Sequence, residues 1–156
     1  MAFATFGAGC FWGVELTFSQ VRGVTATAVG YIGGTKDEPT YQEVCTGRTM
    51  HAEAVLVEYD ESVLDYETLL NTFWQCHNPT TLNRQGPDVG TQYRSVIFTH
   101  DDNQAALAQQ SKDALDASGV FEHPIVTVIE PMQTFWHAEE YHQKYLEKRG
   151  MGSCHI

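Results

Sequence analysis

The sequence predicts an α/β (α+β) fold, a two-layer ferredoxin-like plait built on a mixed sheet. Segments rich in β-branched residues alternate with segments of helical periodicity, and the connections are long enough to cross over a sheet. The expected helices are short, which favours the plait over a doubly wound sheet. Neither an internal repeat nor a linker interrupts the sequence, so we expect a single domain over residues 1–156.

The first half of the chain begins with a short apolar run at residues 1–6 and is expected to hold strands at residues 24–31 and 52–59. Both faces of residues 52–59 are mostly apolar, which predicts a strand near the centre of the sheet. Thr40 is expected to cap a short helix, because Glu43 follows at the spacing of a capping box. The other helices expected here are residues 11–21 and 66–74.

The second half contains a polar stretch without clear period, residues 78–94. An irregular loop of this length inside a compact domain is usually functional. Strands are expected at residues 95–99 and 125–129. Helices are expected at 103–117 and 139–148, and residues 149–156 are expected to form a flexible tail.

The formal net charge of −11 argues against a nucleic-acid partner, since such partners require clustered Lys and Arg. No apolar run approaches the roughly 20 residues that span a membrane. The N-terminus also lacks the charged start and apolar stretch of a signal peptide. We therefore expect no membrane association, a cytoplasmic location and, by default, a monomer.

The stretch Gly9-Cys10-Phe11-Trp12-Gly13 holds the first candidate for chemistry. Its cysteine lies where the first apolar run meets the first helical pattern, at or near a helix N-terminus. Unpaired backbone amides and the helix dipole there favour an anion and would lower the pKa of a thiol. An inert cysteine in an aromatic core fits the same position. The flanking glycines favour a site, because they let the backbone approach a ligand closely.

Glu53 is the most informative acidic residue. It shares a predicted strand face with Val55 and Val57, so its carboxyl group is expected to be desolvated and its pKa raised. A carboxyl group that stays protonated near neutral pH can donate a proton. The alternative is that Glu53 lies at the end of the strand and reaches water.

The four cysteines are too few and too scattered for a disulfide framework. Cys154 stands in the glycine-containing tail, where an accessible thiol could resolve an oxidised cysteine, although an ordinary exposed cysteine is the simpler interpretation. Cys45 and Cys76 lie among apolar neighbours in helical patterns and are interpreted as structural. No metal site is expected, because His137 and His142 are five residues apart and so do not share a helix face. We expect no cofactor.

Several motifs together resemble the peptide methionine sulfoxide reductase A family. They cover essentially the whole chain in the family's order and spacing. They are Gly9-Cys10-Phe11-Trp12-Gly13, Pro39-Thr40-Tyr41, His51-Ala52-Glu53-Ala54-Val55, Asn83-Arg84-Gln85-Gly86, Asp88-Val89-Gly90-Thr91-Gln92-Tyr93-Arg94-Ser95, His142-Gln143 and Tyr145-Leu146.

The resemblance implies reduction of the S epimer of methionine sulfoxide, free or in proteins. Cys10 would attack the sulfoxide sulfur as a thiolate and become a sulfenic acid. Glu53 would protonate the sulfoxide oxygen, and the hydroxyls of Tyr41 and Tyr93 would hold that oxygen by hydrogen bonds. Asp88 would orient the site through hydrogen bonds.

The remaining implied roles concern binding and recycling. Phe11 and Trp12 would line an apolar pocket for the S-methyl group, and His142 would support them. Cys154 matches the family's recycling cysteine, which would form a disulfide with Cys10 that thioredoxin then reduces. We expect no second tail cysteine for a relay and no fused domain for the R epimer.

Two positions depart from the family pattern. Asn78 stands where the family usually has Asp, which is expected to loosen the start of the loop. Met50 stands where it usually has Gly, which is expected to alter the approach to His51.

Two other functions stay open on the residues alone. One is a cysteine hydrolase that pairs Cys10 with one of the seven histidines. The other is a redox sensor that binds methionine or its sulfoxide without turnover.

Overall fold

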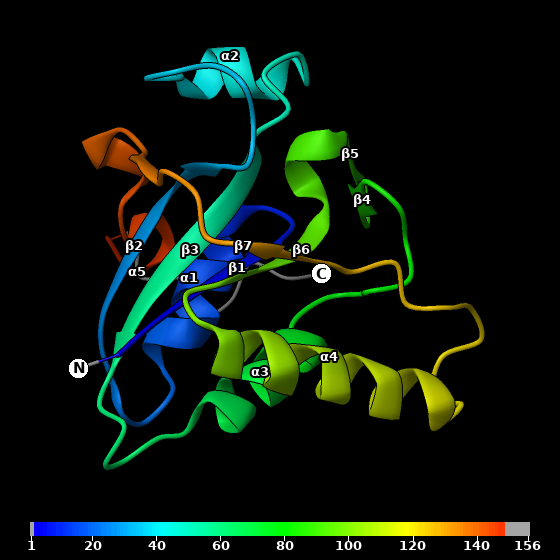
Figure 1. Ribbon diagram of the computed structural model, residues 1–156. Helices are drawn as coiled ribbons and strands as arrows, with labels where there is room; N and C mark the ends of the chain where they lie inside the picture. Colours follow the sequence, from blue (N-terminus) through cyan, green and yellow to red (C-terminus); the bar gives the residue numbers. More distant parts are fainter. Residues whose placement is uncertain (1, 149–156) are drawn as a thin grey trace.

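A mixed sheet forms the centre of the structure, a computed structural model that describes residues 2–148 (Figure 1). Cys154 and the rest of the predicted tail, residues 149–156, lie outside the described residues. The elements along the chain are β1 (Ala2–Ala8), α1 (Phe11–Ser19), β2 (Val24–Ile32), α2 (Tyr41–Cys45), β3 (Ala52–Tyr59), α3 (Tyr66–Gln75), β4 (Arg84–Gln85), β5 (Asp88–Val89), η1 (Thr91–Tyr93), β6 (Ser95–Thr99), α4 (Asp102–Ala117), β7 (Val128–Pro131), β8 (Trp136–His137), η2 (Glu140–His142) and α5 (Tyr145–Lys148).

The strand order of the main sheet is β7-β6-β1-β3-β2-β8. Its four central strands, β6-β1-β3-β2, pair antiparallel with one another, and α1 and α3 make the two crossovers. This arrangement is the predicted ferredoxin-like plait, so the predicted fold class is confirmed. β7 pairs parallel to β6 at one edge, which makes the sheet mixed.

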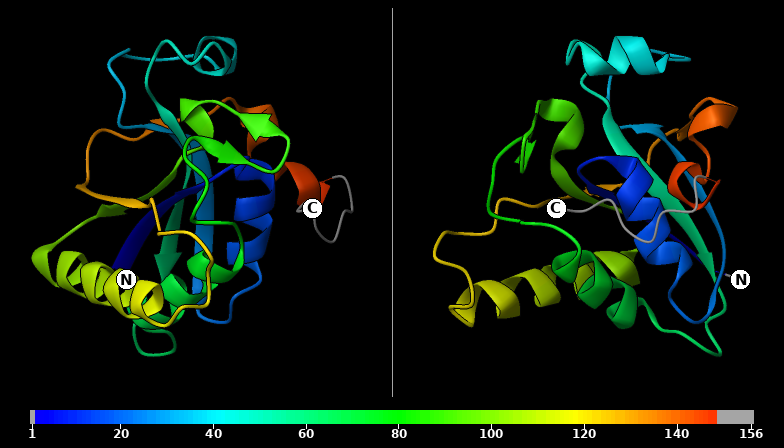
Figure 2. Two further views of the ribbon diagram at one scale, coloured as in Figure 1. Left: turned by 90° about the vertical axis from the view of Figure 1, so that its right-hand side faces the viewer. Right: turned by 180° about the vertical axis from the view of Figure 1, so that it is seen from behind.

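Helices α1, α3 and α4 contribute to one large apolar core on a single face of the sheet (Figure 2). The opposite face carries a smaller cluster of five buried side chains, which Met132 and Phe135 cover from the segment between β7 and β8. Strand β3 is apolar on both faces because it lies between these two clusters. The two-sided strand predicted at residues 52–59 is therefore confirmed.

The helix predicted at residues 139–148 is wrong, because two short pieces, η2 and α5, take its place. Lys144 lies between them with a left-handed φ of 53°, which no continuous helix contains. Its N–H donates to the carboxylate of Glu15 on α1. A contact with a residue distant in the sequence thus overrides the local helical pattern.

The predicted loop at residues 78–94 contains a small β4–β5 hairpin and the 3₁₀ turn η1. At its start, the Asn78 Oδ1 accepts hydrogen bonds from the Thr80 N–H and hydroxyl. The strand predicted at 125–129 begins only at Val128, and the edge strand β8 was not predicted.

The cap predicted for the helix after Thr40 is confirmed. The Thr40 hydroxyl accepts from the Glu43 N–H, and the Glu43 carboxylate accepts from the Thr40 N–H, which completes the capping box.

Candidate active site

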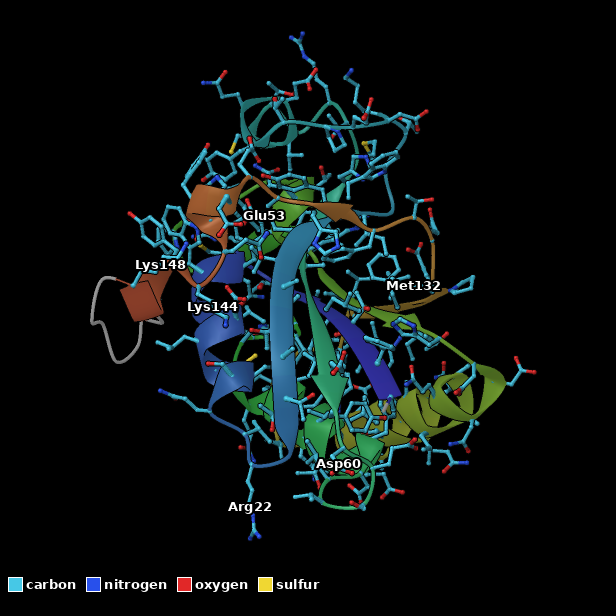
Figure 3. The ribbon with its side chains drawn as sticks, turned by 90° about the vertical axis from the view of Figure 1, so that its left-hand side faces the viewer. Arg22, Glu53, Asp60, Met132, Lys144 and Lys148 are labelled. Carbon is cyan, nitrogen blue, oxygen red and sulfur yellow. The ribbon has the colours of Figure 1, made fainter. Side chains whose placement is uncertain are left out.

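The antiparallel plait brings the ends of distant strands together at one end of the sheet. Cys10 follows β1, Glu53 is near the start of β3, and Tyr93 comes just before β6. Since β1 is antiparallel to both β3 and β6, these three positions meet. Figure 3 shows Glu53 at this end of the sheet and Asp60, which follows β3, at the other.

Cys10 is the N-cap residue of α1, as predicted, and its side chain is partly exposed. Gly9, just before it, has a φ of 96°, and a Cβ there would lie 2.9 Å from the Gln85 Cγ. Only glycine fits this turn without strain or collision. Cys10 opens into a hollow of about 590 Å³ that Asp88 and His77 also line.

Glu53 is buried, with 1% of its surface exposed, so the alternative in which it reaches water is wrong. Its Oε1 accepts a hydrogen bond from the N–H of Phe11, 3.2 Å away, in the first turn of α1. Its Oε2 has no hydrogen-bond partner among the described residues. Burial raises the pKa of Glu53 to about 8, with a smaller contribution from the charge of Asp88. The carboxyl group can therefore hold a proton at neutral pH.

Tyr41 and Tyr93 reach the same region from α2 and η1. Burial raises the pKa of both phenols, and the charge of Glu53 raises it further. The pKa of Tyr93 also responds to Cys10 and Asp88, so these groups lie within electrostatic range of one another. Both phenols remain protonated and can donate hydrogen bonds.

An aromatic wall stands beside Cys10 and consists of Phe11, Trp12, Tyr41, His142 and Tyr145. The Trp12 and Tyr145 rings stack with centroids 3.8 Å apart, and the Tyr41 and His142 centroids are 4.3 Å apart. Phe11 and His142 are buried within the wall, whereas Trp12, Tyr41 and Tyr145 are partly exposed and present an aromatic surface that suits a small apolar group.

His142 is buried at 1% exposure within this wall. The Trp12 indole N–H donates to its Nδ1 at 2.9 Å, so the neutral ring carries its hydrogen on Nε2. That Nε2 has no hydrogen-bond partner among the described residues. Burial lowers the pKa of His142, which favours the neutral ring.

Glu139 is a site residue that the sequence interpretation missed. Its Oε1 accepts from the Tyr31 hydroxyl at 2.8 Å, and its Oε2 accepts from the Tyr41 N–H at 3.0 Å. It thereby ties the first residue of α2 to the sheet. Its position inside an expected helix gave no signal of this contact.

The other described cysteines differ from each other. Cys45 is exposed at the end of α2, against the expectation of an apolar environment, and partial burial raises the pKa of its thiol, with smaller contributions from the charges of Glu53 and Glu139. Cys76 is partly buried, and burial raises its pKa to about 12, which suits a structural thiol.

No group of His, Cys, Asp and Glu within residues 2–148 could hold a metal ion. In that same range, no helix is long and apolar enough to cross a membrane.

Comparison with known proteins places this chain in a family. The family model described as "Peptide methionine sulfoxide reductase" matches residues 2–156. The chain belongs to this family. A relative called peptide methionine sulfoxide reductase MsrA, from Methanoculleus marisnigri, is 64% identical over 151 residues, which are 97% of this chain and 92% of the relative.

Solved structures of relatives share the family fold. The reduced form of Mxr1 from Saccharomyces cerevisiae has a TM-score of 0.90 and 38% identity, covering 98% of this chain and 88% of its own. Mxr1 in complex with Trx2 has a TM-score of 0.65 and 25% identity, covering 92% and 84%. The resemblance based on sequence motifs is thus confirmed.

Proposed function

We propose that this chain reduces the S epimer of methionine sulfoxide, free or in proteins, to methionine. The observation that carries the proposal is the pairing of a helix-capping cysteine with a buried carboxyl group of raised pKa at the same end of the sheet. Membership of the peptide methionine sulfoxide reductase family supports it.

In the proposed reaction, the Cys10 thiolate attacks the sulfoxide sulfur while Glu53 protonates the sulfoxide oxygen. The protonated oxygen then transfers to the Cys10 sulfur as the substrate's S–O bond and the new bond between the two sulfurs break. Cys10 is oxidised by two electrons to a sulfenic acid, and methionine leaves with its sulfur reduced by two electrons. The Glu53 Oε2 has no hydrogen-bond partner among the described residues, so it is the oxygen available to carry the donated proton. The protonated hydroxyls of Tyr41 and Tyr93 are suited to hold the oxygen as its negative charge develops.

We infer that Cys10 and Glu53 titrate as a coupled pair. A thiolate and a carboxylate in one poorly hydrated site repel each other, so the pair retains one shared proton near neutral pH. Burial raises the pKa of Glu53 to about 8, so this carboxyl group can hold the shared proton. Asp88 contributes through its charge, which adds to the rise in the Glu53 pKa.

Substrate binding is proposed at the aromatic wall. Phe11 and Trp12 would contact the S-methyl group, and His142 would hold the Trp12 indole through its Nδ1. A methyl group seated there leaves the sulfoxide oxygen to the two tyrosines. The opposite epimer would exchange the oxygen with another substituent, which gives a physical basis for selecting one epimer.

Recycling is proposed to proceed through Cys154. Its thiol would attack the Cys10 sulfenic acid, release water and form a Cys10–Cys154 disulfide, which thioredoxin then reduces. The complex of the related Mxr1 with Trx2 supports thioredoxin as the reductant.

The test of the function is one round of reaction with a methionine sulfoxide peptide, with methionine quantified. The wild-type chain should release methionine, and Cys10→Ser should release none. Full activity in Cys10→Ser would end the proposal.

A further inference from the structure

A second buried carboxylate, Glu15, takes no part in the proposed chemistry. It lies on α1 and is 2% exposed. Its Oε2 accepts from the Thr27 hydroxyl on β2 at 2.9 Å, and its Oε1 accepts from the Lys144 N–H at 2.5 Å. A charged side chain is rarely buried without a specific set of partners, so this position requires a structural reason.

The contact with Lys144 falls at the break between η2 and α5. Lys144 has a φ of 53°, and this left-handed conformation directs its N–H to α1 instead of into a continuous helix. Figure 3 shows Lys144 beside α1. His142 precedes the break and Tyr145 follows it, so the Glu15 contact lies between two members of the aromatic wall.

Both of those residues hold the ring of Trp12. His142 accepts the hydrogen bond from its indole N–H, and Tyr145 stacks on it with an interplanar angle of 11°. Glu15 lies one turn after Trp12 on the same helix. Glu15 on α1 therefore contacts Lys144, and His142 and Tyr145, which lie on either side of Lys144 in the sequence, contact Trp12 on the same helix.

We propose that Glu15 is a positioning residue of the reductase site: through the Lys144 amide it fixes His142 and Tyr145 against Trp12, and so sets the pocket for the S-methyl group. This inference rests on the proposed function. Gln143 secures the neighbouring backbone to the sheet, since its side chain bonds both the N–H and the carbonyl oxygen of Val29. Glu15 in the same way attaches this backbone segment to helix α1, through the Lys144 N–H.

The test compares Glu15→Leu with Glu15→Gln in single-round methionine release over a range of peptide concentrations. Leucine keeps the volume but removes the acceptor of the part-buried Lys144 N–H. Loss of this hydrogen bond should shift the equilibrium between the ordered and the displaced aromatic wall by about tenfold. The half-saturating concentration should rise by about that factor, while the rate at saturation changes less than in Glu53→Gln. Glu15→Gln retains an acceptor oxygen and should stay near wild type.

Two controls separate positioning from general stability. Thr17→Val, on the same helix, removes only a bond from Thr17 to the Gly13 carbonyl and should leave the half-saturating concentration unchanged. If Glu15→Leu proves unstable, Lys144→Pro removes both the N–H and the left-handed conformation from the other side of the contact, whereas Lys144→Gly keeps both. The proline variant should bind weakly and the glycine variant normally.

Acrylamide quenching of Trp12 gives a readout that does not need turnover. In a Trp74→Phe, Trp136→Phe background, Glu15→Leu should make Trp12 more accessible. A wild-type chain that releases no methionine would refute the proposed function, and quenching would still decide the role of Glu15. Active Glu15→Leu with unchanged half-saturation and unchanged quenching would overturn the positioning role, even if its melting temperature fell.

Discussion

At the scale of single residues, Glu53 is subject to opposing influences on its pKa. Burial raises the pKa and the charge of Asp88 adds to this, whereas the hydrogen bond from Phe11 lowers it. Burial dominates because the side chain is almost fully enclosed and one of its oxygens has no hydrogen-bond partner among the described residues. The result is an acid that keeps its proton where ordinary glutamates have lost theirs.

Glu53→Gln should slow methionine release by about 10²–10⁴-fold, the usual contribution of a general acid. Binding should change little, because glutamine retains the shape and an acceptor oxygen for the Phe11 N–H. Single-round kinetics over a range of substrate concentrations measures both quantities. Glu58→Gln, on the same strand but bonded to Thr25, is the matched control and should behave as wild type. An unchanged rate in Glu53→Gln would remove Glu53 as the acid.

The same pKa predicts how stability depends on pH. The folded pKa of Glu53 is raised to about 8 from 4.5, so folding favours the protonated form. This contribution is complete below the unfolded pKa and is lost as the pH rises to the folded pKa. The free energy of unfolding of the wild type should therefore fall relative to Glu53→Gln between about pH 5 and pH 8, by at most about 1.4 kcal/mol per pH unit. Equal pH profiles in urea denaturation would contradict the raised pKa.

At the scale of elements, the turns around the site carry the backbone constraints. Met50 has a φ of 63° just before His51 and is 48% exposed. His51 is nevertheless fixed, since its Nδ1 accepts from the Gly34 N–H at 3.0 Å and its Nε2 contacts the Lys36 carbonyl oxygen at 2.6 Å. Residue 50 therefore adopts a left-handed backbone conformation even though it is a methionine and not a glycine.

Met50→Gly should raise the free energy of unfolding by up to about 1 kcal/mol, because a left-handed conformation costs a residue with a Cβ about that much. Little packing is lost from so exposed a side chain. Arg48→Gly is the control: Arg48 is exposed in the same turn but is not left-handed, so glycine there should destabilise. Thermal unfolding of the two variants measures the difference. If Met50→Gly destabilised the protein as much as Arg48→Gly, the inference that Met50 is conformationally strained would be contradicted.

How well an element could be predicted depended on whether its signal is local. Strand β3 and the Thr40 cap were predicted because alternation and capping spacing are written in adjacent residues. The break in the predicted helix at residues 139–148 could not be, because Glu15, which binds its backbone, is 129 residues away in the sequence. The β4–β5 hairpin has strands of only two residues, too short for any alternation to show.

The site residues likewise divide into those with a local sequence signal and those without one. The burial of Glu53 followed from its apolar strand face, and the position of Cys10 followed from the start of a helical pattern. Tyr41 and Tyr93 gave no signal of chemistry alone and were found through the family resemblance. Glu139 was missed, since its partners Tyr31 and Tyr41 are about a hundred residues away in the sequence.

At the scale of the whole molecule, the proposed catalytic cycle requires Cys154, in the C-terminal tail, to react with the Cys10 sulfenic acid. Cys154→Ser should still release about one equivalent of methionine, because the first step needs only Cys10 and the acid. It should then fail to turn over with thioredoxin, since no Cys10–Cys154 disulfide can form. Normal thioredoxin-driven turnover in this variant would move the resolving role to Cys45 or Cys76.

The most direct test of the account is stereochemical. The chain would be incubated with the separate S and R epimers of a methionine sulfoxide peptide and dithiothreitol, and the methionine formed would be quantified. We predict conversion of the S epimer alone, because under the proposed binding mode only one epimer can place its methyl group on the aromatic wall and its oxygen toward Glu53 and the two tyrosines at the same time. Conversion of the R epimer, or of neither, would contradict it.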